Sequence, residues 1–384
     1  MQPSWNEHER KLRDQFTELG AQIKATRERT GATGFDAAGW REITKAGLWK
    51  FPIPREYGGR GGSWWDFLAA FEGLSVSVGD LGFLLSIIAH VGCVRVLMQY
   101  GTREQKARFI PMLTEGAIGA TASTEASGGS DVARFRTSAV QTRDGFELTG
   151  HKSHITNAPI ADLFTVVGRV PALGKRDITL FIVERKAAGV RCDAPEDMLG
   201  NNTSPTGDVY FDGVKLGEDD VLGPLGDGLV ITYSMFSLDR ALYGLAAAGH
   251  TESALAQSMQ FAHERVAFKR KIAEHQYVQL KLTDIKIALE TSRAVSYVAL
   301  DRLIRGDQEA NLMCSLAKFV GTEGLFQTAQ NYMQLHGHLG YMQGPIARFL
   351  CDSAGTRIAG GTSDIQRVNI FNQLQKNYEY RDRD

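Results

Sequence analysis

The order of three kinds of sequence along the chain is the feature that most restricts its fold. Residues 1–120 place apolar side chains at helical spacing, residues 121–225 contain short runs of β-branched and aromatic residues, and residues 226–384 return to helical spacing. Few protein families are built as helices, then a β domain, then a helical bundle. The sequence therefore predicts an α+β protein with these three domains in this order.

The N-terminal domain, 1–120, is predicted to be helical. Residues 5–23 and 64–78 repeat apolar side chains with the helical period. Residues 81–100 are more apolar, as expected for a helix buried on most sides. Because His90 and Arg95 interrupt this stretch, we expect it to be shorter and more polar than a membrane span, and we expect no membrane association.

The other two domains have different periodicities. Between 121 and 225 the runs FELTG, DLFTVVGRV, DITLFIVER and DVYFDGVKL are separated by clusters of Gly, Pro, Asn and Asp, which predicts a small antiparallel β domain. From 226 to 384 the stretches 229–267, 273–305 and 312–335 have a period near that of a helix and few breaks. Such long helices predict a four-helix bundle.

Composition and charge argue against nucleic-acid binding, membrane attachment, disulfide bonds and a cysteine metal site. A net charge of −1 and a pI of about 6.8 do not favour nucleic-acid binding or attachment to a membrane surface. Cys93, Cys192, Cys314 and Cys351 are widely spaced without a CxxC pair, which favours reduced thiols over disulfides or a metal site. The N-terminus lacks the apolar run of a signal peptide, so a cytoplasmic location is expected.

Five polar motifs interrupt these domains. The first, TASTEASGGSDVARFRTSA at 121–139, offers hydroxyls and backbone N–H groups that could hold a phosphate or the edge of a heteroaromatic ring. Taken alone, it is equally well explained as a plain polar loop. The other four are GHKSHITNAP at 150–159, RVAFKRKIAEHQYVQ at 265–279, MQLHGHLGYM at 333–342 and ARFLCDSAGTRIAGGTSDIQR at 347–367.

In this order and at these distances, the five motifs resemble those of the acyl-CoA dehydrogenase family of flavoproteins. The resemblance covers nearly the whole chain. It implies a helical–β–helical fold, non-covalently bound FAD, a homotetramer and oxidation of an acyl thioester. The thioester would be an acyl-CoA or an acyl carrier protein, and electrons would leave through an electron-transfer flavoprotein.

The resemblance also assigns cofactor contacts to individual residues. Hydroxyls and backbone of the first motif, residues of the HITN segment, and the terminal loop would contact FAD, while Arg265 and Phe268 would reach the FAD of a neighbouring subunit. The complete set of assigned residues is Ser123, Thr124, Gly129, Ser130, His154, Thr156, Arg265, Phe268, Gln276, Gln334, Gly337, Thr362 and Asp364.

Three of the positions that depart from the family pattern affect contacts with the cofactor or with a neighbouring subunit. His154 stands where an aromatic residue usually covers the flavin, and we expect it to be a flavin contact and not an acid or base. His338 replaces a glycine, and Cys351 replaces an arginine. These two changes affect local contacts with the cofactor or with a neighbouring subunit. The remaining histidines are interpreted as structural.

The catalytic base is absent from its usual place. The family mechanism requires a carboxylate that removes the α proton while the β hydrogen leaves for the flavin, with hydrogen bonds to the thioester carbonyl. Most members carry this glutamate in a segment reading YEGT, whereas this chain has AGGT with Gly360 at that position. The backbone N–H of Gly360 could still bind the thioester carbonyl.

The resemblance suggests a relocated base. In a minority of the family, including isovaleryl-CoA dehydrogenases, the base lies on the first long helix of the C-terminal domain, just before an arginine. Asp239 and Arg240 fall on these two positions. Asp239 is therefore the predicted base, and Ser130, Arg240 and Gly360 are predicted substrate contacts. Alternatively, Asp239 is a helix acid paired with Arg240 or with a lysine and has no catalytic role.

Three functions follow from these observations. The first is an FAD-dependent acyl-thioester dehydrogenase, whose unusual motifs indicate an uncommon acyl group and a place in secondary metabolism. The second keeps the fold and FAD but is an oxidase or monooxygenase. The third is a non-catalytic protein that binds acyl thioesters.

Overall fold

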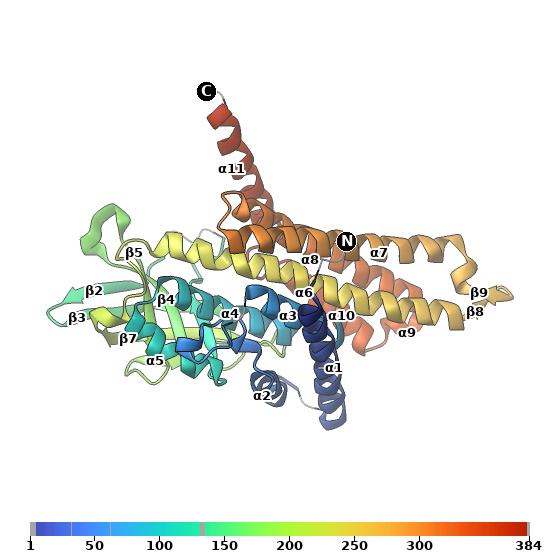
Figure 1. Ribbon diagram of the computed structural model, residues 1–384, viewed down its shortest axis with the longest axis horizontal. Coiled ribbons are helices and arrows are strands. Elements are labelled where there is room, and N and C mark those ends of the chain that lie inside the picture. Colours follow the sequence, from blue (N-terminus) through green and yellow to red (C-terminus); the bar gives the residue numbers. More distant parts are fainter. Residues whose placement is uncertain (1–4, 32, 62, 131–134, 382–384) are drawn as a thin grey trace.

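The computed structural model describes residues 5–31, 33–61, 63–130 and 135–381 and has the predicted order of domains (Figure 1). The N-terminal domain is helical. Its elements are α1 (Glu7–Thr30), α2 (Ala37–Lys45), the 3₁₀ turns η1 (Leu48–Lys50) and η2 (Arg55–Tyr57), α3 (Trp64–Ser77), α4 (Leu81–Tyr100) and α5 (Arg103–Thr114).

Local sequence signals account for the ends of α1 and for the face that it buries. Asn6 and Glu9 form a reciprocal capping box at its N-terminus, and Gly31 ends the helix with a positive φ of 63°. Leu12 and Phe16 lie on the face that packs against α3 in the core. The helix is therefore fixed both by its caps and by its apolar face.

Helix α4 corrects one expectation from the sequence. With 20 residues and a mean hydropathy of 2.0, it is long and apolar enough to cross a membrane, so the expectation that it would be too short and too polar was wrong. In this fold, 83% of it is buried inside the protein, where it packs against α6 and β1. His90 is fully buried and its Nδ1 accepts a hydrogen bond of 3.1 Å from the N–H of Gly119. The buried helix α4 therefore packs against both the middle and the C-terminal domains.

The middle domain forms a seven-stranded sheet in the order β1-β4-β2-β3-β7-β6, with β5 paired to β4. Most neighbours are antiparallel, but β1 runs parallel to β4, and β2 meets β4 in a parallel pair, so the sheet is mixed and not purely antiparallel as expected. Because the β2–β3 hairpin separates β1 from β4 along the chain, the connection is long enough for parallel pairing. The strands are β1 (Gly119–Ala122), β2 (Ser138–Thr142), β3 (Gly145–Thr156), β4 (Leu163–Arg169), β5 (Ile178–Glu184), β6 (Val190–Cys192) and β7 (Thr206–Leu216).

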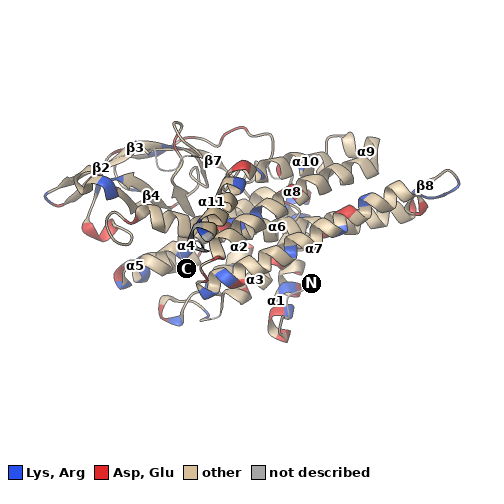
Figure 2. Cartoon of the chain, turned by 90° about the horizontal axis from the view of Figure 1, so that it is seen from above, with Lys and Arg blue, Asp and Glu red and all other residues tan. Residues whose placement is uncertain are grey.

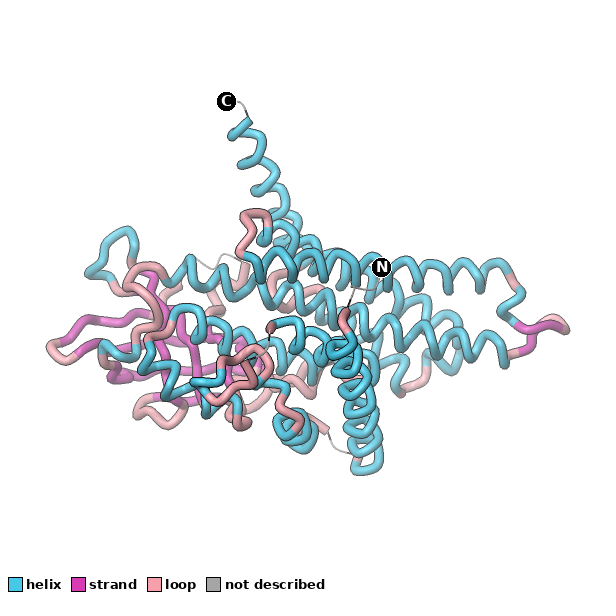
Figure 3. The backbone as a smooth tube through the Cα atoms, in the orientation of Figure 1, coloured by secondary structure: helices cyan, strands magenta, loops and turns pink. Residues whose placement is uncertain are grey.

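The C-terminal domain is built on three long helices, α6 (Gly228–Glu264), α7 (Gln276–Arg305) and α8 (Ala310–His336), which pack on one another. The shorter helices α10 and α11 pack against α8, and α11 projects from the body of the molecule (Figures 1 and 3). The remaining elements are the turns η3 (Pro171–Arg176), η4 (Glu218–Asp220) and η5 (Ile272–Glu274), the hairpin strands β8 (Val266–Ala267) and β9 (Arg270–Lys271), and the helices α9 (His338–Tyr341), α10 (Pro345–Thr356) and α11 (Ser363–Arg381).

A buried ion network joins the N-terminal helices to the bundle. Glu72 of α3 is 1% exposed and accepts a hydrogen bond of 2.9 Å from Nε of Arg293 on α7. Tyr297 donates to the same carboxylate, and Arg293 also pairs with Glu252 of α6. On the outer surface, acidic and basic residues are interspersed along α1 and α7 (Figure 2). The buried charges thus fix the packing of the domains, while the exposed charges face solvent.

Candidate active site

Asp239 lies on α6 in an environment that raises its affinity for protons. The residue is half-buried, and its Oδ1 is enclosed without a hydrogen-bond partner among the described residues. Burial raises the pKa of the carboxyl group from 3.8 to about 7, against the lowering effects of Arg95 and Arg240. A carboxylate that exchanges its proton near neutral pH, and that keeps one oxygen free, can act as a general base.

Two glycines leave room for Asp239 and for its neighbour on α6, Tyr243. A Cβ atom on Gly92 of α4 would lie 2.8 Å from Oδ1 of Asp239, so this glycine leaves room for the carboxylate. Gly360 has a φ of +67°, and a Cβ atom there would lie 2.7 Å from Cε2 of Tyr243. Tyr243 follows Asp239 by one turn of α6, and its ring occupies the space that a side chain at 360 would need. The usual position of the base is therefore closed by Tyr243.

The turn that contains Gly360 presents a free donor. Its hydrogen bonds run from Ala359 N–H to Gly355 and from Ser363 N–H to Arg357, and they leave the N–H of Gly360 without a partner among the described residues. This agrees with the predicted role of Gly360 as a donor to the thioester carbonyl.

The first motif is held in place by a buried ion pair that sequence reasoning missed. Nζ of Lys152 on β3 lies 2.9 Å from Oε1 of Glu125 and 3.0 Å from the carbonyl oxygen of Ser123. The N–H of Ser153 donates to the carbonyl of Thr124 at 3.0 Å. Burial lowers the pKa of Lys152 to about 8. The only sequence signals were a lysine in the second motif and a glutamate in the first, each of which is usually solvated.

These contacts create a surface that fits the edge of a flavin. Thr124 and Thr156 are partly exposed, and the bond from Ser153 to Thr124 holds the loop after β1 against β3. The hydroxyl of Thr121 contacts Sδ of Met235 at 3.2 Å, which places this surface next to the helix of Asp239. Hydroxyls and free backbone groups match the carbonyls and ring nitrogens of FAD, which would bind here. Gly129 and Ser130 lie at the end of the described part of this loop.

His154 lies beside two acidic residues. It has a φ of 57°, its Nδ1 lies 2.8 Å from Oε1 of Glu196, and its backbone N–H donates to Oδ1 of Asp208 at 3.2 Å. The ligand atoms of these three residues lie within 4.8 Å of one another, which is close enough to hold a metal ion, although the sequence predicted no metal site. Each of them already has a polar partner, so the arrangement is also satisfied without a metal.

A cavity of about 540 Å³ adjoins Arg240 between α6, α8 and α11. Three of the residues that line it each have a buried polar atom without a hydrogen-bond partner among the described residues, namely Arg240 Nε, Ser315 Oγ and Asn369 Nδ2. Such a lining suits a flexible ligand with carbonyl acceptors, as in the two amides of a pantetheine arm. Its lining residues are Tyr233, Arg240, Asn311, Ser315, Asn369, Asn372, Gln373, Gln375 and Lys376.

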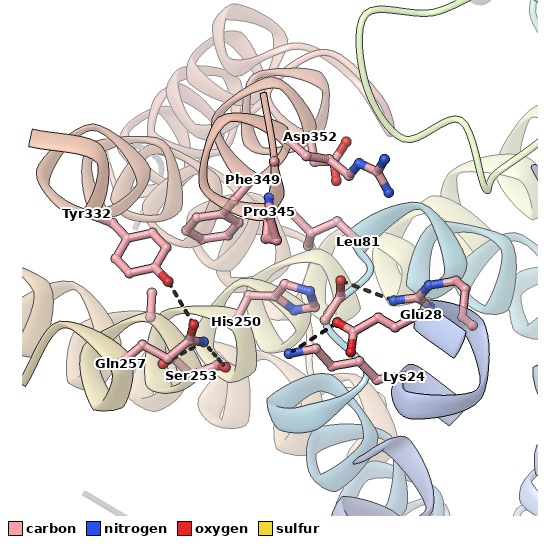
Figure 4. A pocket seen from close by; sticks show the side chains of 15 residues that line it. Lys24, Glu28, Leu81, His250, Ser253, Gln257, Tyr332, Pro345, Phe349 and Asp352 are labelled. Carbon is pink, nitrogen blue, oxygen red and sulfur yellow. Dashed lines mark hydrogen bonds and ion pairs between the residues drawn. The ribbon is translucent and has the colours of Figure 1, made fainter. Parts of the chain in front are cut away.

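A second cavity, of about 230 Å³, shares none of these lining residues (Figure 4). It lies between α1, α6, α8 and α10. Its wall includes the buried His250, which stacks on Phe349, and Tyr332, which donates to Gln257 at 2.7 Å. None of the residues predicted for the active site lines it.

Several predicted cofactor residues lie far from this site. The β8–β9 hairpin ends in Phe268, which is 90% exposed, and lies at the opposite end of the molecule from the β2–β3 hairpin (Figure 1). Arg265 and Gln276 flank this hairpin, and Gln334 and Gly337 lie where α8 meets α9. One chain therefore does not bring these five residues together with Ser123 and His154.

The remaining predicted residues lie at the start of α11. Oγ1 of Thr362 accepts a hydrogen bond of 3.2 Å from the N–H of Ile365, and Asp364 pairs with Arg367 at 2.8 Å. Thr362 thus caps the helix, and Asp364 is exposed.

Comparison with known proteins agrees with this geometry. The sequence models of the N-terminal, middle and C-terminal domains of acyl-CoA dehydrogenases match residues 6–117, 120–214 and 226–375. An acyl-CoA dehydrogenase of Bacillus subtilis is 33% identical over 87% of this chain and 88% of its own length. An L-prolyl-[peptidyl-carrier protein] dehydrogenase of Pseudomonas fluorescens is also 33% identical, over 89% of this chain and 91% of its own.

Solved structures show the same similarity. A prolyl acyl carrier protein oxidase superposes with a TM-score of 0.91 at 29% identity, over 97% of this chain and all of the other. Butyryl-CoA dehydrogenase of Megasphaera elsdenii gives a TM-score of 0.89 at 27% identity, over 98% of this chain and all of the other. The chain belongs to the acyl-CoA dehydrogenase family.

Proposed function

We propose that Asp239 is the base with which this FAD-dependent enzyme removes the α proton of an acyl thioester. The observation that carries the proposal is the raised pKa of about 7 on a carboxylate whose Oδ1 has no hydrogen-bond partner among the described residues. A carboxylate held for structural reasons would be expected to have both oxygens paired. The free N–H of Gly360 and the closure of the usual position by Tyr243 support the same assignment.

The roles of the chain's own groups follow from this arrangement. The Asp239 carboxylate takes the α proton, and the N–H of Gly360 donates to the thioester carbonyl as negative charge develops on its oxygen. Arg240 donates from the wall of the larger cavity to the carrier arm. When bound, FAD supplies the acceptor for the β hydrogen. Because aspartate is one methylene shorter than glutamate, the substrate's α carbon must lie closer to α6.

The carrier is a phosphopantetheine thioester. Among the described residues, the lining of the larger cavity includes Arg240 and Lys376 but no acidic residue, which favours an anionic arm. Such an arm occurs in both coenzyme A and acyl carrier proteins. Relatives named for prolyl carrier proteins support the second of these, and with it a role in secondary metabolism.

A second copy of the chain completes the cofactor site. The exposed Phe268 and its neighbours cannot reach Ser123 of their own chain, so they serve another subunit within a homotetramer. The electrons pass to an electron-transfer flavoprotein, the class for which one structural relative is named. We place the enzyme in the cytoplasm, without attachment to a membrane.

Direct reaction with oxygen is the second candidate, because one relative is named an oxidase. The rate at which the reduced enzyme reoxidises in air separates the two functions. Reoxidation within one turnover time would assign an oxidase, and slow reoxidation would assign a dehydrogenase.

The experiment is anaerobic bleaching of the flavin band by a panel of acyl-CoA and acyl carrier protein thioesters. The wild type is compared with Asp239→Asn, which removes the charge, and with the matched control Asp239→Glu, which keeps it. We expect Asp239→Asn to lose at least about 10³-fold in the rate of bleaching while it retains FAD, and Asp239→Glu to remain measurably active. Bleaching at the wild-type rate by Asp239→Asn would exclude Asp239 as the base. A wild type that binds thioesters but is never bleached would indicate a non-catalytic binding protein.

A further inference from the structure

A buried lysine lies directly behind the turn of Gly360. Lys318 of α8 is 0% exposed, and its Nζ donates to the carbonyl oxygen of Gly361 at 2.6 Å and, more weakly, to that of Arg357 at 3.5 Å. The nearest acid that affects it is Glu323, which is already bonded to Arg357 at 2.8 Å and to Ser363. Burial lowers the pKa of Lys318 to about 7. Because a buried amine without a carboxylate partner is costly, its contacts with this turn call for an explanation.

The turn itself needs support from outside. Gly360 and Gly361 both have positive φ values, 67° and 89°, which glycine reaches without a steric penalty but which it also leaves easily. Gln366, itself fully buried, donates to the carbonyl of Gly361 at 2.9 Å and to that of Gly360 at 3.4 Å. Lys318 and Gln366 therefore hold the same carbonyl from two helices, α8 and α11.

We propose that Lys318 is a positioning residue, which holds the Gly360–Gly361 turn so that the N–H of Gly360 is directed at the thioester carbonyl. A turn with two adjacent glycines has more conformational freedom than one that carries a side chain at 360, so the donor would otherwise be poorly directed. Lys318 touches neither substrate nor cofactor in this scheme, and it acts through the backbone of the turn. The inference rests on the proposed role of Gly360 and does not depend on the identity of the base.

Two unreactive ligands test the proposal. One is a pantetheine thioester that cannot be dehydrogenated, and the other is the matching thioether, in which the carbonyl oxygen is replaced by two hydrogens. Binding of each to the FAD-loaded enzyme is measured by calorimetry and by the change in the flavin spectrum. Because the thioether has no carbonyl, its affinity does not depend on the donor that Lys318 directs.

Lys318→Met keeps an unbranched side chain that is one atom shorter, and it removes the donors. We expect it to weaken thioester binding about tenfold while it leaves thioether binding within about twofold, because a misdirected donor loses most of a hydrogen bond. Gln366→Leu removes the second donor to the carbonyl of Gly361. It should also weaken thioester binding more than thioether binding, but by a smaller factor than Lys318→Met does. It also serves as the independent variant if Lys318→Met does not fold.

Thr322→Val is the matched control. Thr322 is buried one turn along α8, and its hydroxyl donates to the carbonyl of Lys318 at 2.9 Å, so the change removes a buried hydrogen bond without touching the turn. It should affect both ligands equally. Equal losses for the two ligands in Lys318→Met and Gln366→Leu, or no loss, would overturn the proposal. If Asp239→Asn leaves catalysis intact, the assignment of the base fails while this binding result still stands.

Discussion

Asp239 makes the stability of the protein depend on pH. Its pKa rises from 3.8 in the unfolded chain to about 7 in the fold, so the folded state holds the proton more tightly. The stability from this group is fully present below pH 4 and is lost as pH rises through 7, by an upper bound of about 4 kcal/mol. Asp239→Asn should therefore be more stable than the wild type at pH 8, and the difference should shrink below pH 4. Urea unfolding at both pH values measures it, and a difference that does not change with pH would contradict the raised pKa.

The same titration should appear in catalysis. If Asp239 is the base, kcat/KM rises with pH and levels off above about 7, because only the ionised carboxylate accepts the proton. Asp239→Glu should move the midpoint of this profile, whereas Thr322→Val should leave it in place. A midpoint that is the same in both variants would assign the titration to another group.

Gly360 cannot readily accept a side chain. Its φ is positive, and an added methyl group would lie 2.7 Å from the ring of Tyr243, so a substitution there combines backbone strain with steric overlap. We expect Gly360→Ala to cost about 1–3 kcal/mol of stability and to lower kcat more than it raises KM. Thermal unfolding and steady-state kinetics measure the two effects. Tyr243→Phe is the control, since it keeps the ring and should leave both nearly unchanged.

At the scale of elements, the pair of Lys152 and Glu125 is the main support of the flavin-side loop. Lys152→Met leaves the buried Glu125 carboxylate without its cation, although the backbone N–H groups of Arg136 and Thr137 still donate to it, and should cost about 3 kcal/mol as well as weaken FAD retention. Lys152→Met combined with Glu125→Leu should recover part of the stability. Lys215→Met, which breaks an exposed pair with Glu147 on the same sheet, is the control and should have little effect. Denaturant midpoints and FAD release by gel filtration compare the four proteins.

The helices of this protein could be predicted from the sequence more fully than its sheet or its site. The periodic stretches at 273–305 and 312–335 correspond to α7 and α8, because the helical period is a local property. The parallel pairing of β1 with β4 could not be predicted, since it depends on which strands meet after a long connection. The resemblance pointed to Asp239 and Gly360 as candidates, and their roles stay predictions. It did not point to Tyr243 or Lys318, whose proposed roles rest on contacts between α6, α8 and the terminal turn.

At the scale of the whole molecule, the separation of the β8–β9 hairpin from the sheet predicts that subunits complement one another. A chain with Asp239→Asn supplies a normal hairpin, and a chain with Phe268→Asp supplies a normal base. Each variant should be impaired alone, and Phe268→Asp should be impaired through loss of FAD. In a mixed pair, the Phe268→Asp chain keeps its base and receives a normal hairpin from the Asp239→Asn chain, so one of the two sites should be intact. Activity after the two are unfolded and refolded together, compared with each refolded alone, tests this. Additive activities would exclude a shared site.

Helix α4 has a consequence for how this protein is made. Its cover includes α6, which a ribosome completes only after the whole middle domain has followed α4 out of the exit tunnel. During that interval this apolar helix lacks its main partner and is exposed to chaperones and to other nascent chains. A fragment that stops before Gly228 should therefore bind a hydrophobic dye strongly and be retained by a chaperone, whereas the full chain, in which α6 covers α4 and is itself covered by α7 and α8, should not. The enzyme's dependence on cellular folding assistance would then be set by the helices that are made last.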